Sequence, residues 1–398
     1  MIDFDFKNHC TGCQVCSDVC PKSCITFKHD EYGFVLPHVD VTLCIDCGRC
    51  EKACPVLSKK SRDLHRHVFC TYNLNTAERQ LGSSGSIMML LANEVIDLGG
   101  RVYGAAFDEN MIVKHTCAST HEELRKQAKS KYIQSNTRGV YQSVLGNLKD
   151  ELFVMFVGTP CQCEALSNVV PQHLRKKLLI VDFICHGVPS QKLFNDSIKE
   201  YEKRRKCKVT SFSFREKSQD YLRNFKITYV KAGVKYDEIG KEDTFPFYYA
   251  FLRHYSFRNS CFDCRFANSS RMSDITLGDM WGIEKKDEVE DFHKGYSLIY
   301  TNTTGGQEWY NRIISKCRSK EFDLNDKRVF NYAYSLPTHK NLWNIVFRFC
   351  YKNFSYSFTE RLLCRKFEDV NKLHKVFLLV LGKLNKYYSL INKASNGN

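Results

Sequence analysis

Apolar residues in the middle of the chain fall into short runs divided by turn residues. Residues 87–98 are strongly apolar, follow Ser83-Ser84-Gly85 and end at Gly99-Gly100. Serine is favoured at a helix N-cap and glycine just beyond a helix C-terminus, so this stretch predicts a helix. Residues 101–107 and 112–117, with a polar turn between them, predict a β-hairpin.

Two continuous apolar runs follow, at residues 152–157 and 178–184. The first ends in Gly158-Thr159-Pro160-Cys161 and the second in Cys185-His186-Gly187. Such runs on either side of a helical stretch are typical of parallel strands buried on both faces. We therefore expect both cysteines at one carboxyl edge of a sheet, where open α/β sheets bind ligands.

The C-terminal half is expected to continue with strands and to finish in helices. Alternating residues predict strands within residues 208–240, and an aromatic stretch at 244–257 predicts a helix. Further strands are expected at 274–280 and 296–303, and basic amphipathic helices after residue 335.

The first 57 residues have a different character. Residues 25–27 and 34–36 flank a polar turn and predict a small hairpin. Residues 58–67 are rich in Ser, Lys, Arg and His and predict a linker. The chain is thus expected to begin with a small separate module.

Composition is that of a globular protein except in cysteine and in basic charge. The 398 residues, 43% hydrophobic and 26% charged, suffice for about two or three domains. Twenty cysteines are unusual in a reducing compartment unless many bind metal. The first residues lack the basic and apolar regions of a signal peptide, and no apolar run reaches the roughly 18 residues of a membrane span. We expect a cytoplasmic protein, or one peripheral to the membrane.

The net charge of +15 is concentrated at the C-terminal end, where 11 basic and 3 acidic residues follow from Lys340 onward. A second basic cluster is Lys203-Arg204-Arg205-Lys206. Such charge suits nucleic acid, an anionic membrane or an acidic partner, and equally a solvated helix face. Since no nucleic-acid motif accompanies it, we do not expect a nucleic-acid partner. Peripheral membrane contact through the basic tail stays open.

One cysteine pattern occurs twice, as Cys10-x-x-Cys13-x-x-Cys16-x-x-x-Cys20-Pro21 and as Cys44-x-x-Cys47-x-x-Cys50-x-x-x-Cys54-Pro55. The spacing is typical of the bacterial run that holds [4Fe–4S] cubanes, in which three thiolates bind one cube and the fourth ligates the other. We therefore expect one cubane on Cys10, Cys13, Cys16 and Cys54, and another on Cys44, Cys47, Cys50 and Cys20. Zinc sites usually pair two C-x-x-C units without the third cysteine and the final C-P. The pattern predicts a protein that moves single electrons.

Four further cysteines lie on turn-like loops: Cys161, Cys185, Cys261 and Cys264. One C-x-x-C unit with two single cysteines can form a four-thiolate site. The alternative is a set of scattered core cysteines, because a free cysteine buries well.

The chain resembles the β subunit family of coenzyme F-420-reducing hydrogenases and dehydrogenases, whose relatives include 7-hydroxymethyl chlorophyll a reductase. The resemblance rests on the dicluster motifs and on segments that follow in order up to residue 303. They are Ser83-Ser84-Gly85-Ser86, Ser130-Lys131-Tyr132-Ile133-Gln134-Ser135, Gly158-Thr159-Pro160-Cys161-Gln162, Cys185-His186-Gly187-Val188-Pro189-Ser190, Ser260-Cys261-x-x-Cys264-x-Phe266-Ala267, and Arg271-x-Ser273-Asp274-Ile275-Thr276-Leu277-Gly278-Asp279-Met280-Trp281-Gly282.

The resemblance implies an α+β / α/β protein: a ferredoxin-like dicluster module, a mixed α/β flavin-binding domain and a C-terminal helical region. The corresponding ranges are 1–57 for the module, 68–150 and 151–334 for the two parts of the flavin domain, and 335–398 for the tail. It also implies FAD and a third [4Fe–4S] cluster on Cys161, Cys185, Cys261 and Cys264. Cys163 is then expected to be a packing residue. The same is expected of Cys24, Cys70, Cys117, Cys207, Cys317, Cys350 and Cys364.

The flavin contacts that the resemblance implies are Ser84, Gly85, Ser86, Lys131, Tyr132, Gly158 and Thr159. A helix N-terminus suits a pyrophosphate, and Gly85 would permit close approach of a phosphate or ring. Lys131 would place positive charge beside a reduced ring. The alternatives are that residues 83–86 form only an ordinary helix N-cap and that Lys131 is a surface lysine.

Lys131 and His186 are the candidate catalytic residues. His186 is either a proton donor to substrate or a structural histidine, and the second reading is favoured. Asp182 and Asp279 are expected to be buried carboxylates beside the site, and Trp281 either stacks on a ring or fills the core.

The expected function is that of an oxidoreductase in which FAD links one-electron cubanes to a two-electron substrate. The substrate is coenzyme F-420 or another small molecule, and the expected partner is ferredoxin or another oxidoreductase subunit. The alternative is an electron-transfer subunit that docks a catalytic partner or a membrane surface and has no substrate of its own.

Overall fold

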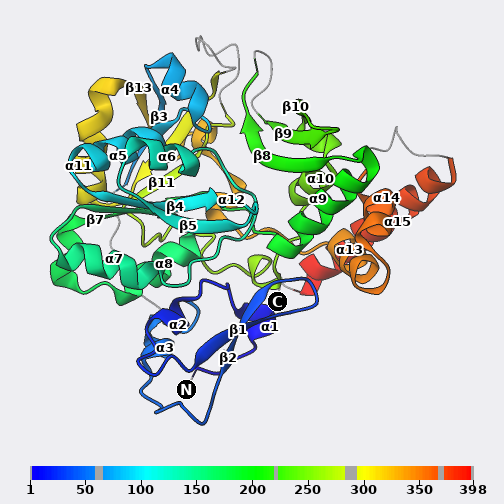
Figure 1. The fold of residues 1–398 in the computed structure, drawn as a ribbon, viewed down its shortest axis with the longest axis horizontal. Helices are drawn as coiled ribbons and strands as arrows, with labels where there is room; N and C mark the ends of the chain where they lie inside the picture. The colour runs from blue at the N-terminus through cyan, green and yellow to red at the C-terminus, as the bar shows by residue number, and fades with distance from the viewer. Residues whose placement is uncertain (1, 59–65, 219–222, 283–293, 366–371, 396–398) are drawn as a thin grey trace.

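The computed structural model describes residues 2–58, 66–218, 223–282, 294–365 and 372–395. An eight-stranded sheet forms its centre, in the order β13-β3-β12-β11-β7-β6-β4-β5 (Figure 1). The strands are β3 (His67–Asn73), β4 (Arg101–Phe107), β5 (Val113–Ala118), β6 (Val154–Gly158), β7 (Leu178–Phe183), β11 (Ile275–Asp279), β12 (Ser297–Thr301) and β13 (Cys317–Phe322).

Pairing within this sheet is parallel at the centre and antiparallel outside it. β4, β6, β7 and β11 are parallel neighbours, whereas β5, β12, β3 and β13 pair in antiparallel fashion. The β4–β5 hairpin and the parallel β6 and β7 strands predicted from the sequence are confirmed. Strands from residues 68–150 and 151–334 therefore pair in a single sheet.

Helices cover both faces of the sheet. On one face lie α5 (Ile87–Asp97), α6 (His121–Gln127) and α11 (Thr304–Ile313), and α4 (Thr76–Leu81) lies near them (Figure 1). On the other face lie α7 (Val140–Lys149) and α8 (Pro160–Val169). α5 is the apolar helix predicted from the sequence, and Gly99, with a φ of +73°, ends it as expected.

A second layer of structure packs beside the large sheet. β8 (Lys208–Glu216), β9 (Asn224–Lys231) and β10 (Val234–Lys241) form a three-stranded antiparallel sheet. α9 (Gln191–Arg205) and α10 (Pro246–Leu252) pack on it through phenylalanines such as Phe194 and Phe247. The helix predicted over 244–257 is shorter than expected, because His254 adopts a left-handed φ of +61° that an α-helix cannot contain.

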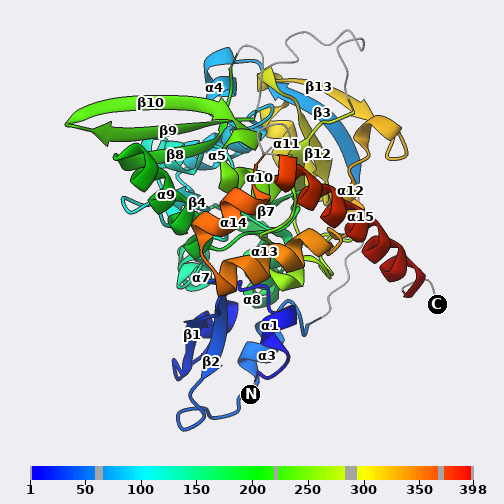
Figure 2. The ribbon, with the colours of Figure 1, turned by 90° about the vertical axis from the view of Figure 1, so that its right-hand side faces the viewer.

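Four helices form the C-terminal region: α12 (Tyr332–Ser335), α13 (Leu342–Asn353), α14 (Tyr356–Leu363) and α15 (Lys372–Ser395). Figure 2 shows α13, α14 and α15 side by side on one face of the molecule. Phe347, Tyr356 and Leu381 join them to the aromatic core of the second layer. The predicted C-terminal helices are confirmed.

The N-terminal module lies below α7 and α8 in Figure 1. It holds α1 (Phe6–His9), α2 (Val15–Asp18), the antiparallel hairpin of β1 (Ile25–His29) and β2 (Val35–Val39), and α3 (Arg49–Ala53). The predicted hairpin is confirmed. Of the expected linker, residues 59–65 lie outside the described residues, and His67 already begins β3.

Gly85 lies at the close approach of the α5 start to β3. Its N–H donates to Ser297 Oγ at 2.9 Å, and its carbonyl accepts from the N–H of Asn73. A Cβ at this position would lie 2.4 Å from the carbonyl oxygen of Thr71. A glycine is therefore needed here for packing of backbone on backbone.

We expect Gly85→Ala to lower the free energy of unfolding by about 1–3 kcal/mol, because the new methyl group overpacks the α5–β3 contact. Gly146→Ala is the matched control: no atom lies within 4 Å of its added Cβ, and Gly146 is inside α7. This control should instead raise stability by about 0.5–1 kcal/mol through helix propensity. Denaturant unfolding of both variants measures the difference, and equal stabilities would contradict the packing role.

Candidate functional site

A cavity of about 420 Å³ opens at the carboxyl edge of β6 and β7. Segments from across the chain line it, from Thr11 in the N-terminal module to Thr338 after α12. The edge is the one where parallel sheets bind ligands, as the sequence predicts.

Four thiols line this cavity together. Cys161 lies in the first turn of α8, and Cys185 is the second residue after β7. Cys261 ends the short 3₁₀ turn Asn259–Cys261, three residues before Cys264. The structure thus brings together all four central cysteines that the sequence singled out.

Burial makes these thiols hard to ionise on their own. Burial first, and the charge of the neighbouring Cys264 second, raise the pKa of Cys161 and the pKa of Cys261 to about 12 each. A cation that binds thiolates removes this cost, and soft sulfur ligands favour iron clusters or zinc. The donor set therefore fits a [4Fe–4S] cluster, which takes one thiolate for each iron. Among the described residues, no three His, Cys, Asp or Glu side chains gather closely enough for a single metal ion.

The N-terminal cysteines fall into two groups. Burial, and after it the charges of Cys54, Cys16 and Cys10, raise the pKa of Cys13, which places these four thiols together. The other four motif cysteines line a small second cavity: Cys20, Cys44, Cys47 and Cys50. Cys24 lines it too, with its sulfur 3.3 Å from that of Cys20. The last cysteine of each motif thus lies with the first three of the other motif. This is the crossed grouping that the spacing predicts.

The two motifs turn their backbones in the same way. Gly12 and Asp46 occupy equivalent positions and have φ values of +67° and +50°. Gln14 and Gly48 are also equivalent, with φ values of +62° and +69°. Left-handed residues between the cysteines keep each turn tight, so that the thiols can face one centre.

Comparison with known proteins agrees with this geometry. Residues 153–327 match the family described as the C terminus of the coenzyme F420 hydrogenase/dehydrogenase beta subunit, and residues 9–57 match the 4Fe-4S dicluster domain. The chain thus combines an N-terminal 4Fe–4S dicluster domain with a C-terminal domain of the coenzyme F420 hydrogenase/dehydrogenase beta subunit type.

Curated relatives match the dicluster domain alone. The chain is 46% identical over 41 residues to ferredoxin 7Fe of Hydrogenibacillus schlegelii, covering 10% of this chain and 46% of the relative. It is 36% identical over 59 residues to the ferredoxin-type protein NapF of Haemophilus influenzae, covering 15% and 34%. It is 39% identical over 56 residues to NADH-quinone oxidoreductase subunit I 2 of Geobacter metallireducens, covering 13% and 42%. The chain thus spans less than half the length of each.

A solved chain of the F420-reducing [NiFe] hydrogenase complex from Methanosarcina barkeri is similar over 66% of this chain and 85% of that chain. The identity is 15% and the TM-score 0.44.

The dicluster domain is fastened directly to the wall of the central cavity. Arg258, which is 2% exposed, donates to the carbonyls of Cys10 and Val35 and to the side chain of Gln134. Gln134 in turn donates to the carbonyl of Thr11 at 2.8 Å. The guanidinium fork suits this role because it can meet several oxygens in fixed directions.

A second set of contacts holds the same turn from the other side. The hydroxyls of Thr137 and Tyr141 donate to the carbonyl of Cys13 at 2.7 Å and 2.9 Å. Asp18 accepts from the N–H groups of Gly139 and Tyr141. The first cysteine turn is therefore also held against the start of α7. Sequence reasoning missed Arg258 and Tyr141, because neither stands in a motif.

Most of the expected flavin contacts line the central cavity. They are Ser84, Ser86, Lys131, Tyr132, Gly158 and Thr159, and His186 lies there as well. Gly85 is not among the lining residues, since β3 fills the space beside it; the close ligand approach expected there is replaced by backbone packing. Trp281 also lines the cavity and is 51% exposed, so it does not fill the core.

The start of α5 has N–H groups without a side-chain cap. Ser86 is the N-cap residue, but its φ is +65° and its hydroxyl donates to the carbonyl of Glu78 instead. Lys217 holds the same loop by donating to the carbonyl of Ser84 at 2.6 Å. This lysine is buried, and burial, with Arg79 and Arg215 after it, lowers its pKa to about 7.

Lys131 is anchored at the C-terminal end of α6. Its amino group donates to the carbonyls of Ala128, Lys129 and Lys126, at 2.6 Å, 3.1 Å and 3.2 Å. Burial, and secondly the charge of Lys129, lowers its pKa to about 7. It is therefore a fixed group on the cavity wall, unlike the surface lysine of the alternative.

Two ion pairs with buried arginines border the cavity. Arg215 bonds both oxygens of Asp279, at 2.9 Å and 3.1 Å, and also the hydroxyl of Tyr132. Arg271 meets Asp182 at 3.3 Å, where both side chains are 1% exposed. Both carboxylates were expected beside the site, but their arginine partners were not. Arg271 belongs to one of the segments that carry the family resemblance, and Arg215 stands in a strand with no motif signal.

His186 opens into the cavity beside a second histidine. Its ring stacks on that of His254 with centroids 6.4 Å apart, and its carbonyl accepts from Thr338. Burial lowers the pKa of His186, an effect that Asp279 opposes. Its role, as a proton donor to substrate or as a structural group, stays a prediction.

We expect Arg258→Leu to loosen the dicluster domain from the cavity wall. Three oxygens would lose their charged donor, at a cost of about 2–4 kcal/mol. Hydrogen exchange should then become faster for the amides of residues 10–16 and 134–141. The control is Arg125→Leu, which removes an exposed arginine on α6. Unchanged exchange at residues 10–16 would show that Arg258 does not hold this contact.

Proposed function

We propose that this protein is an iron–sulfur flavoprotein oxidoreductase. It would exchange electrons with a one-electron carrier such as ferredoxin, and a hydride with a small two-electron substrate, coenzyme F-420 or another molecule. The observation that carries the proposal is that four thiols and most of the expected flavin contacts line one cavity. The family match supports the same conclusion.

The three thiol groups would hold three [4Fe–4S] clusters. Such clusters supply one-electron chemistry when bound. Cys161, Cys185, Cys261 and Cys264 would hold the central one, and the Thr159 hydroxyl lies 3.1 Å from Cys161 Sγ, where it can donate to a thiolate. Arg271 opposes the burial that raises the pKa of Cys264, and so favours its thiolate form.

FAD would occupy the rest of the cavity and supplies conversion between single electrons and a hydride. The uncapped N–H groups at the start of α5, with Ser84 and Ser86, would bind its pyrophosphate. Lys131 would place a cation at the ring, and Tyr132, Gly158 and Thr159 would form the adjoining wall. Arg215 keeps Tyr132 and Asp279 in fixed positions on this wall.

The alternative is an electron-transfer subunit that has no substrate of its own. The exposed Trp281 and the open ring of His186 support the first reading, because they leave a polar and aromatic surface for a substrate inside the cavity. Flavin binding separates the two, since a one-electron relay needs no hydride carrier.

We expect anaerobically reconstituted protein to hold about 12 iron atoms per chain, four for each cluster. Cys261→Ser and Cys264→Ser should each lower this to about eight, because serine replaces a soft ligand by a hard one. Cys163→Ser is the control, since Cys163 is buried in α8 and its thiol faces backbone carbonyls. Iron and sulfide analysis decides the matter. About eight iron atoms in the parent protein would remove the central cluster from the proposal.

We expect Lys131→Met to lower the midpoint potential of the bound flavin by roughly 20–40 mV, which corresponds to about 1–2 kcal/mol for two electrons. A pKa of about 7 means that Lys131 is charged below this pH and neutral above it. The difference from the parent should therefore be larger at about pH 6 than at about pH 9.

Spectroelectrochemical titration measures this shift, with Lys126→Met as control because Lys126 is exposed on the same stretch of chain. Equal flavin potentials in parent and Lys131→Met would remove Lys131 from the flavin site. Reconstituted protein without any flavin would favour the electron-transfer alternative.

A further inference from the structure

The last helix, α15, packs on the protein through one side. Leu381 is buried, and Asn385 accepts from the N–H of Leu342 on α13 at 2.8 Å. The carbonyl of Leu362, at the end of α14, meets the ring of His374. These contacts fix which side of the helix faces outward.

The outward side carries a row of apolar residues. Val376, Val380, Leu384 and Tyr387 are 51%, 53%, 52% and 68% exposed. Their spacing of four, four and three residues places them on one stripe of the helix. We refer to these four residues as the α15 stripe. An exposed stripe of this kind normally marks a surface that something else covers.

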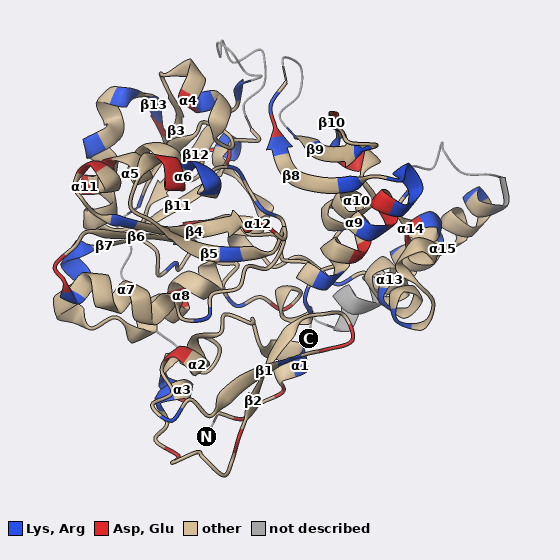
Figure 3. Cartoon of the chain, in the orientation of Figure 1, with Lys and Arg blue, Asp and Glu red and all other residues tan. Residues whose placement is uncertain are grey.

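The charge around the α15 stripe is almost wholly positive. The sequence of α15 contains five lysines and no acidic residue, and Figure 3 shows blue and no red on the described part of this helix. Beside it runs a groove of about 870 Å³. Its charged lining residues are Arg253, Arg365, Lys383, Lys386 and Asp243. Within the described part of the chain, Arg253, Lys383 and Lys386 form no salt bridge, so their charge is available to an outside partner.

We propose that α15 lies on the surface of a bilayer that contains anionic phospholipid. The α15 stripe would enter the boundary between headgroups and acyl chains, and the lysines would meet the lipid phosphates. This combination of an apolar stripe, a basic polar side and low overall hydrophobicity is typical of helices that lie in a membrane interface. No helix among the described residues is long and apolar enough to cross a bilayer. The proposal is independent of the chemistry at the central cavity.

A second copy of the chain is a weaker candidate for the same stripe. Pairing two α15 helices would bring ten lysines together without a carboxylate on either helix. Like charges at short range repel, whereas an anionic lipid surface attracts all of them. The charge of the helix therefore favours the membrane.

The test is sedimentation of the full chain with vesicles of phosphatidylcholine alone, and with vesicles that also contain phosphatidylglycerol. We expect binding to the anionic vesicles only, and weaker binding at high salt, because salt screens the lysine–phosphate attraction. The double variant Val380→Asp/Leu384→Asp should lower the bound fraction by roughly tenfold or more, because it places carboxylates in the apolar interface. Lys383→Glu/Lys386→Glu should do the same by reversing charge.

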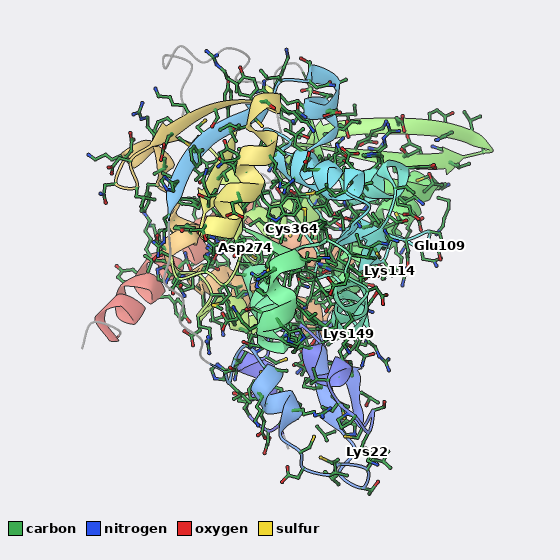
Figure 4. The ribbon with its side chains drawn as sticks, turned by 90° about the vertical axis from the view of Figure 1, so that its left-hand side faces the viewer. Lys22, Glu109, Lys114, Lys149, Asp274 and Cys364 are labelled. Carbon is green, nitrogen blue, oxygen red and sulfur yellow. The ribbon has the colours of Figure 1, made fainter. Side chains whose placement is uncertain are left out.

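Two matched controls should keep the parent's vesicle binding. Val234→Asp alters a valine that is also 53% exposed, but in β10. Lys149→Glu reverses a charge at the end of α7, which Figure 4 places apart from α15. Circular dichroism and cluster absorbance verify that every variant is folded. If Val380→Asp/Leu384→Asp disturbs the folding of the tail, the test rests on Lys383→Glu/Lys386→Glu, since both lysines are exposed.

Three results would overturn the proposal. The first is equal binding to neutral and anionic vesicles, and the second is full binding by the lysine variant. The third is a parent protein that forms dimers in solution, ignores vesicles and becomes monomeric with Val380→Asp/Leu384→Asp. That result would mean that a second copy covers the α15 stripe.

Discussion

Four thiols can surround one cavity only if segments far apart in the sequence end at the same edge of the sheet. Parallel pairing of β6 with β7 and of β7 with β11 meets this constraint. It places the ends of β6 and β7, and with them Cys161 and Cys185, at one edge. The loop with Cys261 and Cys264 comes from a different layer, and it reaches this edge because the second sheet packs beside the first. The remaining architecture follows from holding these ends in place.

The dicluster domain depends on the same edge. Its first cysteine turn has hardly any room, since a Cβ on Gly12 would lie 2.4 Å from the side chain of Gln134 and 2.7 Å from that of Arg258. These contacts are made to backbone carbonyls of the turn, so they hold its position independently of its side chains. A domain joined in this way can keep a constant distance from the cavity, which single-electron transfer between fixed centres requires. The exposed Cys47 lies in the other turn, away from this contact.

Sequence patterns predicted those parts of the structure that depend on local chemistry. The two cysteine motifs carry their geometry within eleven residues each, and the apolar runs of β6 and β7 are enough to predict buried strands. The crossed grouping of Cys54 with Cys13 could also be predicted, because it follows from the repeat of the motif. The pattern of apolar residues along the sequence, however, does not predict which distant residue a polar side chain contacts. Arg258, Arg215 and Lys217 act through carbonyls and carboxylates that are distant in sequence, and only the fold brings them together. Gly85 gives the opposite case: its motif was recognised, but its glycine serves the packing of α5 on β3.

The placement of charge divides the molecule into two regions with different roles. Beside the cavity, Arg215 and Arg271 each have a carboxylate partner, Asp279 and Asp182, because an unpaired buried charge there would cost several kcal/mol. Such pairs fix side chains in place and leave little net field. On α15, Lys383 and Lys386 are exposed and form no salt bridge within the described part of the chain, and an exposed unpaired charge costs little. Unpaired charge beside exposed apolar side chains gives the protein no stability by itself. It contributes free energy only when the helix meets an anionic surface with an apolar interior. The charge and the exposed apolar side chains of the tail are therefore explained by a partner and not by folding.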